Sequence, residues 1–258
     1  MHLAATGAAK AEANAAALTA FLKATPPVDA PTEVRLDVTN VPVATVVDHC
    51  NALYQAATNA SISSDVRVLP RVATGTVGED DRPELGPLTP AAMTPALGYT
   101  LYGHVAMGGT FDRLHGGHKM LLTRAALVTE SRLRIGMTGP ILLSKGRPKA
   151  NAEFMQSFAV RSETVAAFMR AIRPDLHCDI FELETGDGGV IGIPDVTAMV
   201  CSPETLPAIE GINKARAERD PPLAPTVPVV IAYVGGGDND TRVSSSKLRQ
   251  LAADGKIV

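Results

Sequence analysis

The apolar residues of this chain fall into two kinds of pattern: short continuous runs, and longer stretches in which apolar positions recur every three or four residues. Short runs predict buried strands, and the longer spacing predicts helices with one apolar face. From residue 105 onward the two kinds alternate, with strands predicted over 105–107, 133–137, 177–183, 198–201 and 227–234 and helices over 116–129, 159–172, 203–219 and 247–253. Such alternation predicts a parallel sheet with crossover helices.

The first hundred residues carry a shorter version of the same alternation. Residues 1–24 are rich in alanine but have few bulky apolar side chains, which predicts a peripheral helix. A small βαβ-like unit and then a linker or surface loop are predicted after the break at Pro26 and Pro27: a strand over 34–38, a helix over 43–57, a strand over 66–69 and a loop over 75–98. We therefore expect an extension and linker over residues 1–100 and a larger α/β domain over residues 101–258.

Composition narrows the class of protein. A length of 258 residues with 45% hydrophobic and 20% charged residues is typical of a globular protein with a proper core. The net charge is −3 and no long run of lysine or arginine occurs, so we expect no extended nucleic-acid surface. No run of about 18 apolar residues occurs either, so we expect no membrane span.

The cysteines indicate a reducing compartment. Cys50, Cys178 and Cys201 are far apart, odd in number and not part of a CxxC motif, which favours free thiols. The first two dozen residues include Glu12 and no arginine, which is a poor match to a mitochondrial presequence. We therefore expect a cytoplasmic protein.

The segment from His104 to Lys119, HVAMGGTFDRLHGGHK, has the pattern of a strand, a phosphate-binding turn and a helix. Gly108 and Gly109 allow a sharp turn and close approach to a ligand, and the free N–H groups of the helix that follows suit an anion. His115 and His118 are three residues apart and share one face of that helix. A metal half-site and two ordinary surface histidines are the alternatives; the former is disfavoured because no neighbouring cysteine or further histidine completes a coordination set.

Two motifs carry a family resemblance. GGTFDRLHGGH resembles the T/HxGH signature of the nucleotidylyltransferase superfamily, and VSSSKLR at 243–249 resembles its ISSTxxR signature. Their order and separation are similar to those of eukaryotic-type phosphopantetheine adenylyltransferases over about residues 103–254. The resemblance implies a Rossmann-like parallel sheet with helices on both faces, and transfer of AMP from ATP to 4'-phosphopantetheine with Mg²⁺, giving dephospho-coenzyme A and pyrophosphate. It leaves open contacts with other enzymes of coenzyme A biosynthesis.

The resemblance also implies roles for individual residues. His118 is expected at the α-phosphate in the transition state, and Lys145, with Lys149 as second choice, on a loop over the polyphosphate. Phosphate and nucleotide contacts are expected from residues of four of the five segments that follow the strands predicted from residue 105 onward: Gly109, Thr110, Phe111, His115, Arg161, Ser202, Glu204, Asn213, Lys214, Arg216, Ser244, Ser245, Ser246 and Arg249. No protein-held metal site is expected.

The same residues also allow purely structural interpretations. The serines would serve only as a helix cap, Asp112 would cap a turn, Arg161 would be an exposed residue at a helix start, and Lys214 and Arg216 would lie on a solvated helix surface. Another acceptor such as nicotinamide mononucleotide, a CTP-dependent cytidylyltransferase, and a non-catalytic nucleotide-binding relative are the alternative functions.

Overall fold

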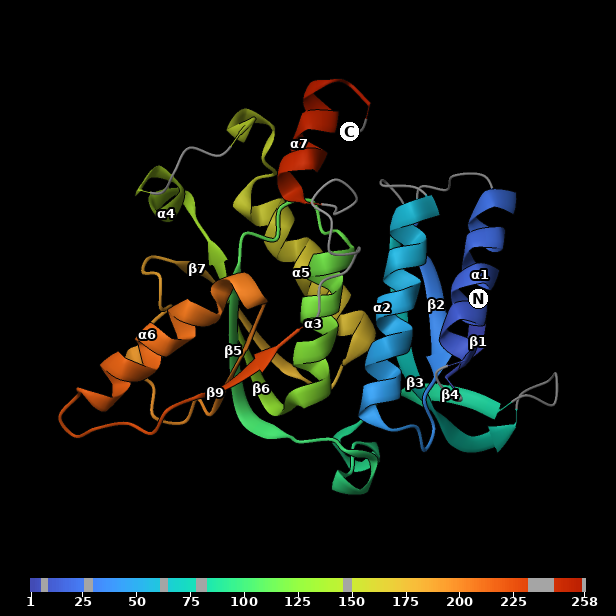
Figure 1. Cartoon of the computed structure of the whole chain (residues 1–258), viewed down its shortest axis with the longest axis horizontal. Helices are drawn as coiled ribbons and strands as arrows, with labels where there is room; N and C mark the ends of the chain where they lie inside the picture. Colours follow the sequence, from blue (N-terminus) through green and yellow to red (C-terminus); the bar gives the residue numbers. More distant parts are fainter. Residues whose placement is uncertain are drawn as a thin grey trace.

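Two β-sheets lie beside each other in the computed structural model, with helices packed between and around them (Figure 1). The structure describes residues 1–5, 9–25, 30–60, 65–77, 83–145, 150–231 and 244–256. We call the first sheet with its helices the N-terminal unit (residues 1–97) and the second the C-terminal unit (residues 101–256).

The C-terminal unit is built on a five-stranded parallel sheet in the order β7-β6-β5-β8-β9. Its strands are β5 (Tyr102–Gly109), β6 (Thr129–Thr138), β7 (His177–Leu183), β8 (Ala198–Cys201) and β9 (Val227–Val230). The chain runs outward from β5 to β7 and then returns to place β8 on the other side of β5. Ligands of such sheets bind where the order reverses, at the carboxyl ends of the strands. Here that place lies between β5 and β8.

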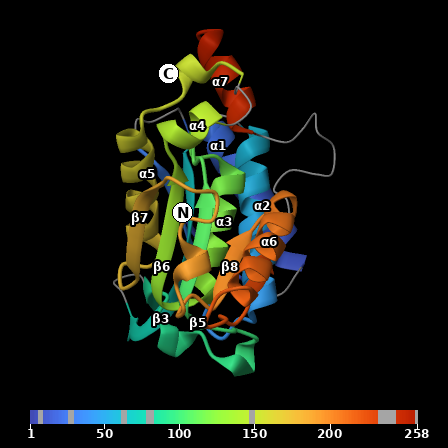
Figure 2. The ribbon, with the colours of Figure 1, turned by 90° about the vertical axis from the view of Figure 1, so that its left-hand side faces the viewer.

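Helices cover both faces of this sheet because the crossover direction reverses with the strand order. The helices of this unit are α3 (Gly116–Val128), α4 (Pro140–Lys145), α5 (Phe158–Ile172), α6 (Leu206–Ala217) and α7 (Ser245–Ala253), of which α3, α5 and α6 pack on the faces. Val105 and Met107 of β5 belong to the core that α3 and α5 cover, whereas Ala106 between them belongs to a second core with Ile209 and Ile212 of α6. Figure 2 shows α4 and α7 at the end of the sheet where the strands terminate. The predicted Rossmann-like α/β fold is confirmed.

Most predicted elements of this unit are confirmed within a few residues, and the strands over 177–183 and 198–201 are confirmed at both ends. The helix predicted over 203–219 is shorter, because a 3₁₀ turn (Pro203–Thr205) precedes α6. The loop predicted after β6 is wrong in part, since α4 occupies its first half. The end of the strand predicted over 227–234 lies outside the described residues.

The N-terminal unit contains the predicted βαβ arrangement: β2 (Thr32–Asp37), α2 (Val43–Ala60) and β3 (Val66–Val77), with β2 and β3 parallel. Two expectations for this unit are wrong. A short strand, β1 (His2–Ala4), precedes α1 (Ala9–Ala24) and pairs with β2. Part of the predicted linker is also structured, since β4 (Pro83–Pro87) pairs antiparallel with β3, and 3₁₀ turns follow at Pro90–Ala92 and Pro95–Leu97.

The two units share one hydrophobic core. Leu53 and Tyr54 of α2 belong to the same buried cluster as Leu122 and Ala126 of α3. The Tyr54 hydroxyl lies 3.4 Å from Oγ1 of Thr123 inside this cluster. A division of the chain into two independent domains near residue 100 therefore stays a prediction, although the two sheets are separate.

Buried arginines tie the ends of the elements together. Arg173 follows α5 and is 1% exposed. Its Nη1 donates to the carbonyl oxygens of Ala126 (2.9 Å) and Thr129 (3.3 Å), where α3 gives way to β6. Its Nε and Nη2 both donate to the carboxylate of Asp175, at 2.8 Å each, and these bonds lower the pKa of that carboxyl. One side chain thus connects the carboxyl ends of α3 and α5.

Replacing this side chain tests its contribution to stability. We expect Arg173→Met to lower the free energy of unfolding by about 3 kcal/mol, because two buried carbonyl oxygens lose their donor and the partly exposed ion pair with Asp175 is broken. Urea denaturation measures it. Arg170→Met is the matched control in the last turn of α5: Arg170 is 64% exposed and pairs with Glu163, which is 72% exposed, so its loss should be below about 1 kcal/mol. Equal losses in the two variants would contradict the role of Arg173.

Candidate active site

The carboxyl ends of three neighbouring strands meet at the point where the strand order reverses. Gly109 of β5 lies opposite Met137 of β6, and Met107 lies opposite Val200 of β8. The residues that follow these strands, Thr110, Thr138 and Ser202, are therefore brought to one edge of the sheet. Oγ1 of Thr110 lies 3.5 Å from Oγ1 of Thr138.

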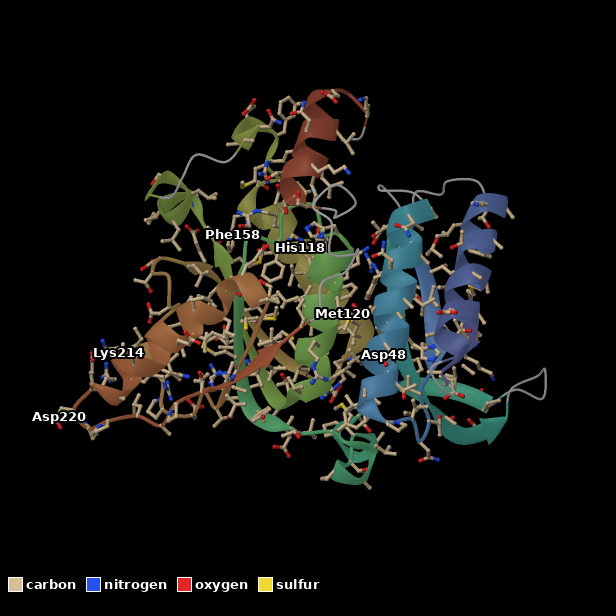
Figure 3. All side chains as sticks on the ribbon, viewed as in Figure 1. Asp48, His118, Met120, Phe158, Lys214 and Asp220 are labelled. Carbon is tan, nitrogen blue, oxygen red and sulfur yellow. The ribbon has the colours of Figure 1, made fainter. Side chains whose placement is uncertain are left out.

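His115 and His118 form a stacked pair at the amino end of α3. His115 is the N-cap residue and His118 lies in the first turn. Their ring centroids are 3.9 Å apart with an interplanar angle of 25°, and the ring of Phe111 lies 5.3 Å from that of His118. Figure 3 shows His118 close to this end of the helix. The first N–H groups of α3 have no partner within the helix, so the histidines lie where positive potential is concentrated.

Glycine is required at two positions around this pair. A Cβ on Gly117 would lie 3.2 Å from the ring of His115, and a Cβ on Gly109 would lie 3.0 Å from the ring of Phe111. Both distances are tighter than ordinary van der Waals contact. The glycines therefore leave room for the two aromatic rings, and the ligand contact expected for Gly109 stays a prediction.

The loop between β5 and α3 has an unusual backbone. Phe111 and Arg113 both adopt φ of +49°, a left-handed conformation that costs a residue with a side chain about 1–3 kcal/mol. The peptide N–H of Arg113 donates to Oε1 of Gln156 (2.9 Å), and its Nη2 donates to the carbonyl oxygen of Phe154 (3.1 Å). Contacts with a distant segment thus hold this loop in its strained form.

Asp112 joins the two signature segments. Its side chain is fully buried, and Oδ2 accepts a 2.7 Å hydrogen bond from Nη1 of Arg249, which is 1% exposed. Oδ1 accepts from the peptide N–H of Gln156 at 3.0 Å. Arg249 donates further to the carbonyl oxygen of Ala150 (2.9 Å) and to Oγ of Ser246 (3.1 Å). Asp112 is therefore an ion-pair partner, and the turn-capping interpretation is wrong.

The three serines at the start of α7 all contact protein groups. Oγ of Ser244 accepts from the peptide N–H of Lys247 at 3.3 Å, as an N-cap does. Oγ of Ser245 donates to the carbonyl oxygen of Asp112 at 3.0 Å, and Ser246 accepts from Arg249. The amino end of α7 is thereby fixed beside the β5–α3 loop. The guanidinium of Arg249 is enclosed by these contacts, and its expected direct contact with the pyrophosphate stays a prediction.

Arg161 also contacts protein groups. It is 2% exposed, so the interpretation as an exposed residue at a helix start is wrong. Its Nη1 donates to the carbonyl oxygen of Thr110 (2.6 Å) and its Nη2 to that of Thr138 (3.1 Å). Burial lowers the pKa of Arg161, although a guanidinium keeps its charge. The side chain connects the ends of β5 and β6, and the ligand contact expected for Arg161 stays a prediction.

The segment after β6 brings α4 over the strand ends. Lys145 ends α4 in the structure, but its side chain, like the whole of Lys149, lies outside the described residues. Glu182, at the end of β7, places its carboxylate in the space that a side chain on Gly139 would fill. A carboxylate is therefore present at this end of the sheet, and the expected lysine contact stays a prediction.

The predicted contacts from the segment after β8 divide into two groups. Ser202 directly follows β8 beside β5, with its Oγ 3.3 Å from Oγ1 of Thr205, and Glu204 is exposed in the same 3₁₀ turn. These two lie at the carboxyl edge of the sheet. Their expected role as nucleotide contacts is compatible with that placement and stays a prediction.

Asn213, Lys214 and Arg216 lie at the opposite end of the sheet, because α6 runs antiparallel to the strands. The side chain of Asn213 bonds the backbone of Thr226, just before β9 begins. Arg216 is 1% exposed and donates to four carbonyl oxygens, those of Val190, Ile193, Val196 and Ala224. Lys214 is exposed and far from His118 in Figure 3. The placement of α6 does not favour the expected contacts of these three residues with the nucleotide, which stay predictions. The solvated-surface interpretation holds for Lys214 and is wrong for Arg216.

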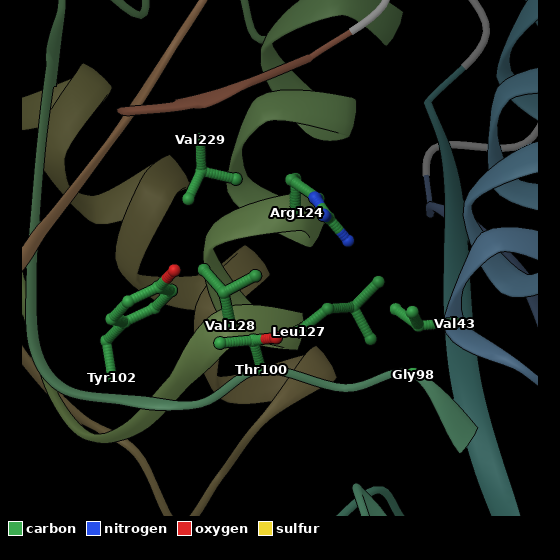
Figure 4. A pocket seen from close by; sticks show the side chains of 8 residues that line it. All are labelled: Val43, Gly98, Thr100, Tyr102, Arg124, Leu127, Val128 and Val229. Carbon is green, nitrogen blue, oxygen red and sulfur yellow. The ribbon is translucent and has the colours of Figure 1, made fainter. Parts of the chain in front are cut away.

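The hollow drawn in Figure 4 is not part of this site. Tyr102, which begins β5, lines it together with Arg124 and Val128 from the second half of α3. These residues are at the amino ends of the strands, whereas Thr110 and His118 are at the carboxyl ends.

Sequence reasoning missed two residues that shape the site. Gln156 contacts Asp112 and Arg113, and its carbonyl oxygen accepts from Nε of Arg161 at 3.1 Å. No pattern in the sequence distinguishes it, because its role depends on a loop that folds back over 44 residues. Thr138 could have been found, since it directly follows a predicted strand.

Known proteins resemble this chain over more than half of its length. No family model matches. The phosphopantetheine adenylyltransferase of Saccharomyces cerevisiae is 32% identical over 149 residues, covering 57% of this chain and 47% of the yeast protein. The phosphopantetheine adenylyltransferase of Methanopyrus kandleri is 36% identical over 152 residues, covering 58% and 91%. A crystal structure of a protein with unknown function from Archaeoglobus fulgidus is 26% identical, with a TM-score of 0.43, covering 54% of this chain and 96% of that one.

The parallel sheet with helices on both faces, and the helix-start histidines at its switch point, define a Rossmann-like α/β protein with an anion-suited ligand site. The match to nearly the whole archaeal enzyme makes the assignment more specific. The chain belongs to the phosphopantetheine adenylyltransferase family. It spans about half the length of the yeast relatives that it matches.

The buried pair of Asp112 and Arg249 yields a stability prediction. We expect Arg249→Met to cost about 3–5 kcal/mol, because Asp112 would keep a buried charge without its partner. The double variant Asp112→Asn/Arg249→Met should recover part of that loss, since neither charge remains. Urea denaturation measures both, and Lys256→Met, which removes an exposed ion pair beyond α7, is the control. Additive losses in the double variant would contradict the pairing.

Proposed function

We propose that the protein is an adenylyltransferase of coenzyme A biosynthesis that moves AMP from ATP to 4'-phosphopantetheine, giving dephospho-coenzyme A and pyrophosphate. The observation that carries the proposal is the stacked pair of His115 and His118 at the amino end of α3, at the switch point of the sheet, in a chain of this family. Two stacked histidine rings at the positive end of a helix suit a phosphoryl group under attack.

The reaction needs positioning more than side-chain chemistry. A phosphate oxygen of the acceptor attacks the α-phosphorus of ATP in line, the new P–O bond forms, the bond to the bridging oxygen breaks, and pyrophosphate leaves. A dianionic phosphate is already a competent nucleophile, so no general base is required. His118 and the first N–H groups of α3 would donate hydrogen bonds to the oxygens of the phosphoryl group as charge develops on them.

The remaining residues divide by distance from the ligand. Thr110 lies at the strand end beside the histidines, and Ser202 and Glu204 lie where β8 ends, so these three are proposed to contact the substrates. Arg161 and Arg249 are proposed to act through the loop that they hold. Lys145 is proposed to approach the polyphosphate from the end of α4.

Mg²⁺ is proposed to accompany ATP. Among the residues that the structure describes, no group of three or more His, Cys, Asp or Glu side chains is arranged to hold a metal ion. Mg²⁺ keeps several waters and commonly takes substrate phosphate oxygens as ligands. We therefore expect phosphate oxygens of ATP and water to supply most of the ligands of Mg²⁺. The ion would offset part of the negative charge of ATP.

We further propose a cytoplasmic location. Cys50, Cys178 and Cys201 are free, and burial raises the pKa of Cys50 to about 12 and that of Cys178 to about 11, which keeps these thiols protonated and unreactive. Within the described parts of the chain, no helix combines the length and apolar character needed to cross a bilayer. Contacts with other enzymes of the pathway stay an expectation.

The choice of acceptor tests the proposal. With Mg²⁺ and ATP, the purified protein should release pyrophosphate when 4'-phosphopantetheine is added, and much less with nicotinamide mononucleotide, phosphocholine or phosphoethanolamine. CTP should fail as donor, because a site that bonds one base leaves buried groups unsatisfied with another. Coupled pyrophosphate detection measures each rate. Release only with CTP or with nicotinamide mononucleotide would reject the proposed substrates, and ATP binding without release would indicate a non-catalytic relative.

His118 provides a test at residue level. We expect His118→Ala to lower the turnover number by about 10²–10³, as loss of one transition-state donor does, while the dissociation constant of ATP changes much less. His115→Ala should have a milder effect if His115 chiefly orients its neighbour. His177→Ala, an exposed histidine at the start of β7, is the matched control and should be silent. Turnover of His118→Ala within threefold of wild type would contradict the role.

A further inference from the structure

We propose that the N-terminal unit holds the catalytic helix α3 in place, and that Lys119 and Asp65 are positioning residues for His118. The proposal rests on the proposed function for its catalytic part. Its structural part rests on contacts between the two units.

Lys119 directly follows His118 and lies at the interface of the units. It is 3% exposed. Its Nζ donates to Oδ1 of Asp65 at 2.6 Å and to the carbonyl oxygen of Val66 at 2.9 Å, both at the start of β3. A charge-assisted bond of this length is short and directional, with the ammonium buried and the Asp65 side chain 48% exposed. It fixes the first turn of α3 against the first residues of β3.

Successive residues of a helix are turned by about 100°, so His118 and Lys119 point in different directions from the same turn. The ring of His118 packs against His115 and Phe111 of the β5–α3 loop, and Lys119 faces the N-terminal unit. Thr123 lies one turn beyond Lys119 on the same face, and its Oγ1 is 3.4 Å from the hydroxyl of Tyr54 in α2. Two polar contacts, one turn apart, therefore define the rotation of α3 about its axis.

The N-terminal unit also contacts the carboxyl end of α5. Arg71 of β3 donates to the carbonyl oxygens of Ala171 (2.6 Å) and Ile172 (3.3 Å), the last residues of α5. A cation at a helix carboxyl end also interacts favourably with its dipole. Because Arg161 near the other end of α5 holds Thr110, the unit supports both sides of the β5–α3 loop.

A buried lysine destabilises the folded state unless its ammonium group has a charged or hydrogen-bonding partner. Burial lowers the pKa of Lys119, and the carboxylate of Asp65 opposes that shift. The surroundings that face Nζ are Asp65 and, farther away, the guanidinium of Arg67, which lies 3.5 Å from the other oxygen of Asp65. An apolar side chain would fill the same space without the cost, so the ion pair indicates a need for a fixed geometry.

The test uses the full chain with Asp65→Ala, which leaves the buried lysine in place and removes its partner. Amide hydrogen exchange should become at least tenfold faster in residues 116–122 and change little in β7. Turnover should fall by about tenfold while the KM for ATP stays within twofold, because the ligand groups remain but their alignment is lost. Lys119→Met should give the same pattern, and the double variant should be no worse than the poorer single one.

Asp48→Ala is the matched control, an exposed carboxylate of α2 (labelled in Figure 3), and Lys10→Met is the control for the lysine. Neither should change exchange in α3 or turnover. The proposal is overturned if Asp65→Ala equals Asp48→Ala in both measurements, or if exchange rises without any loss of turnover. If the wild-type protein shows no adenylyl transfer, the proposed function fails. Hydrogen exchange in Asp65→Ala then still tests the structural part: faster exchange in α3 supports the role of the N-terminal unit in holding this helix, and unchanged exchange contradicts it.

Discussion

The ion pair of Asp112 and Arg249 is the interaction on which the site depends. Both side chains are enclosed by protein, and a carboxylate or guanidinium alone in such a place would be strongly destabilising. Each charge therefore requires the other. Because the two residues are 137 positions apart, their pairing forces the carboxyl-terminal helix α7 onto the loop that carries the histidines. Two segments that would otherwise be independent loops become one structure.

The other buried arginines extend the same principle from side chains to the backbone. Loops at the ends of strands and helices leave carbonyl oxygens without partners, and buried ones must find donors. Arg161 supplies them at the ends of β5 and β6, Arg173 at the end of α3, and Arg216 in the segments that lead into β8 and β9. A planar group with five donors can serve several carbonyls at once. This support is what allows Phe111 to keep a left-handed backbone beside the site.

The sequence predicts what is local and misses what is paired over long distances. The strand of residues 177–183 and the spacing of His115 and His118 are visible because hydrophobic period and helix geometry act over a few residues. The strand β4 was not predicted, because residues 75–98 are rich in proline and glycine and such segments have low strand propensity. In the structure, pairing with β3 overrides that low propensity. Arg216 and Arg249 were expected at ligands because their segments resemble family motifs, and only the fold shows that carbonyl oxygens surround Arg216 and that Asp112 pairs with Arg249.

Placement of Asn213 and Arg216 shows how direction along a helix decides function. Both lie in a segment whose sequence resembles a family motif expected near the nucleotide. The helix α6, however, runs from the carboxyl to the amino ends of the strands, so its last turns lie away from the site. The first turn of α3 shows the reverse case. There a single residue step separates His118, packed against His115 and Phe111, from Lys119, turned to the N-terminal unit. One short helix can thus carry a ligand group on one side and its anchor on the other. A transition-state donor is effective only when its position is fixed before the reaction begins, so the anchor belongs to the chemistry as much as the donor does.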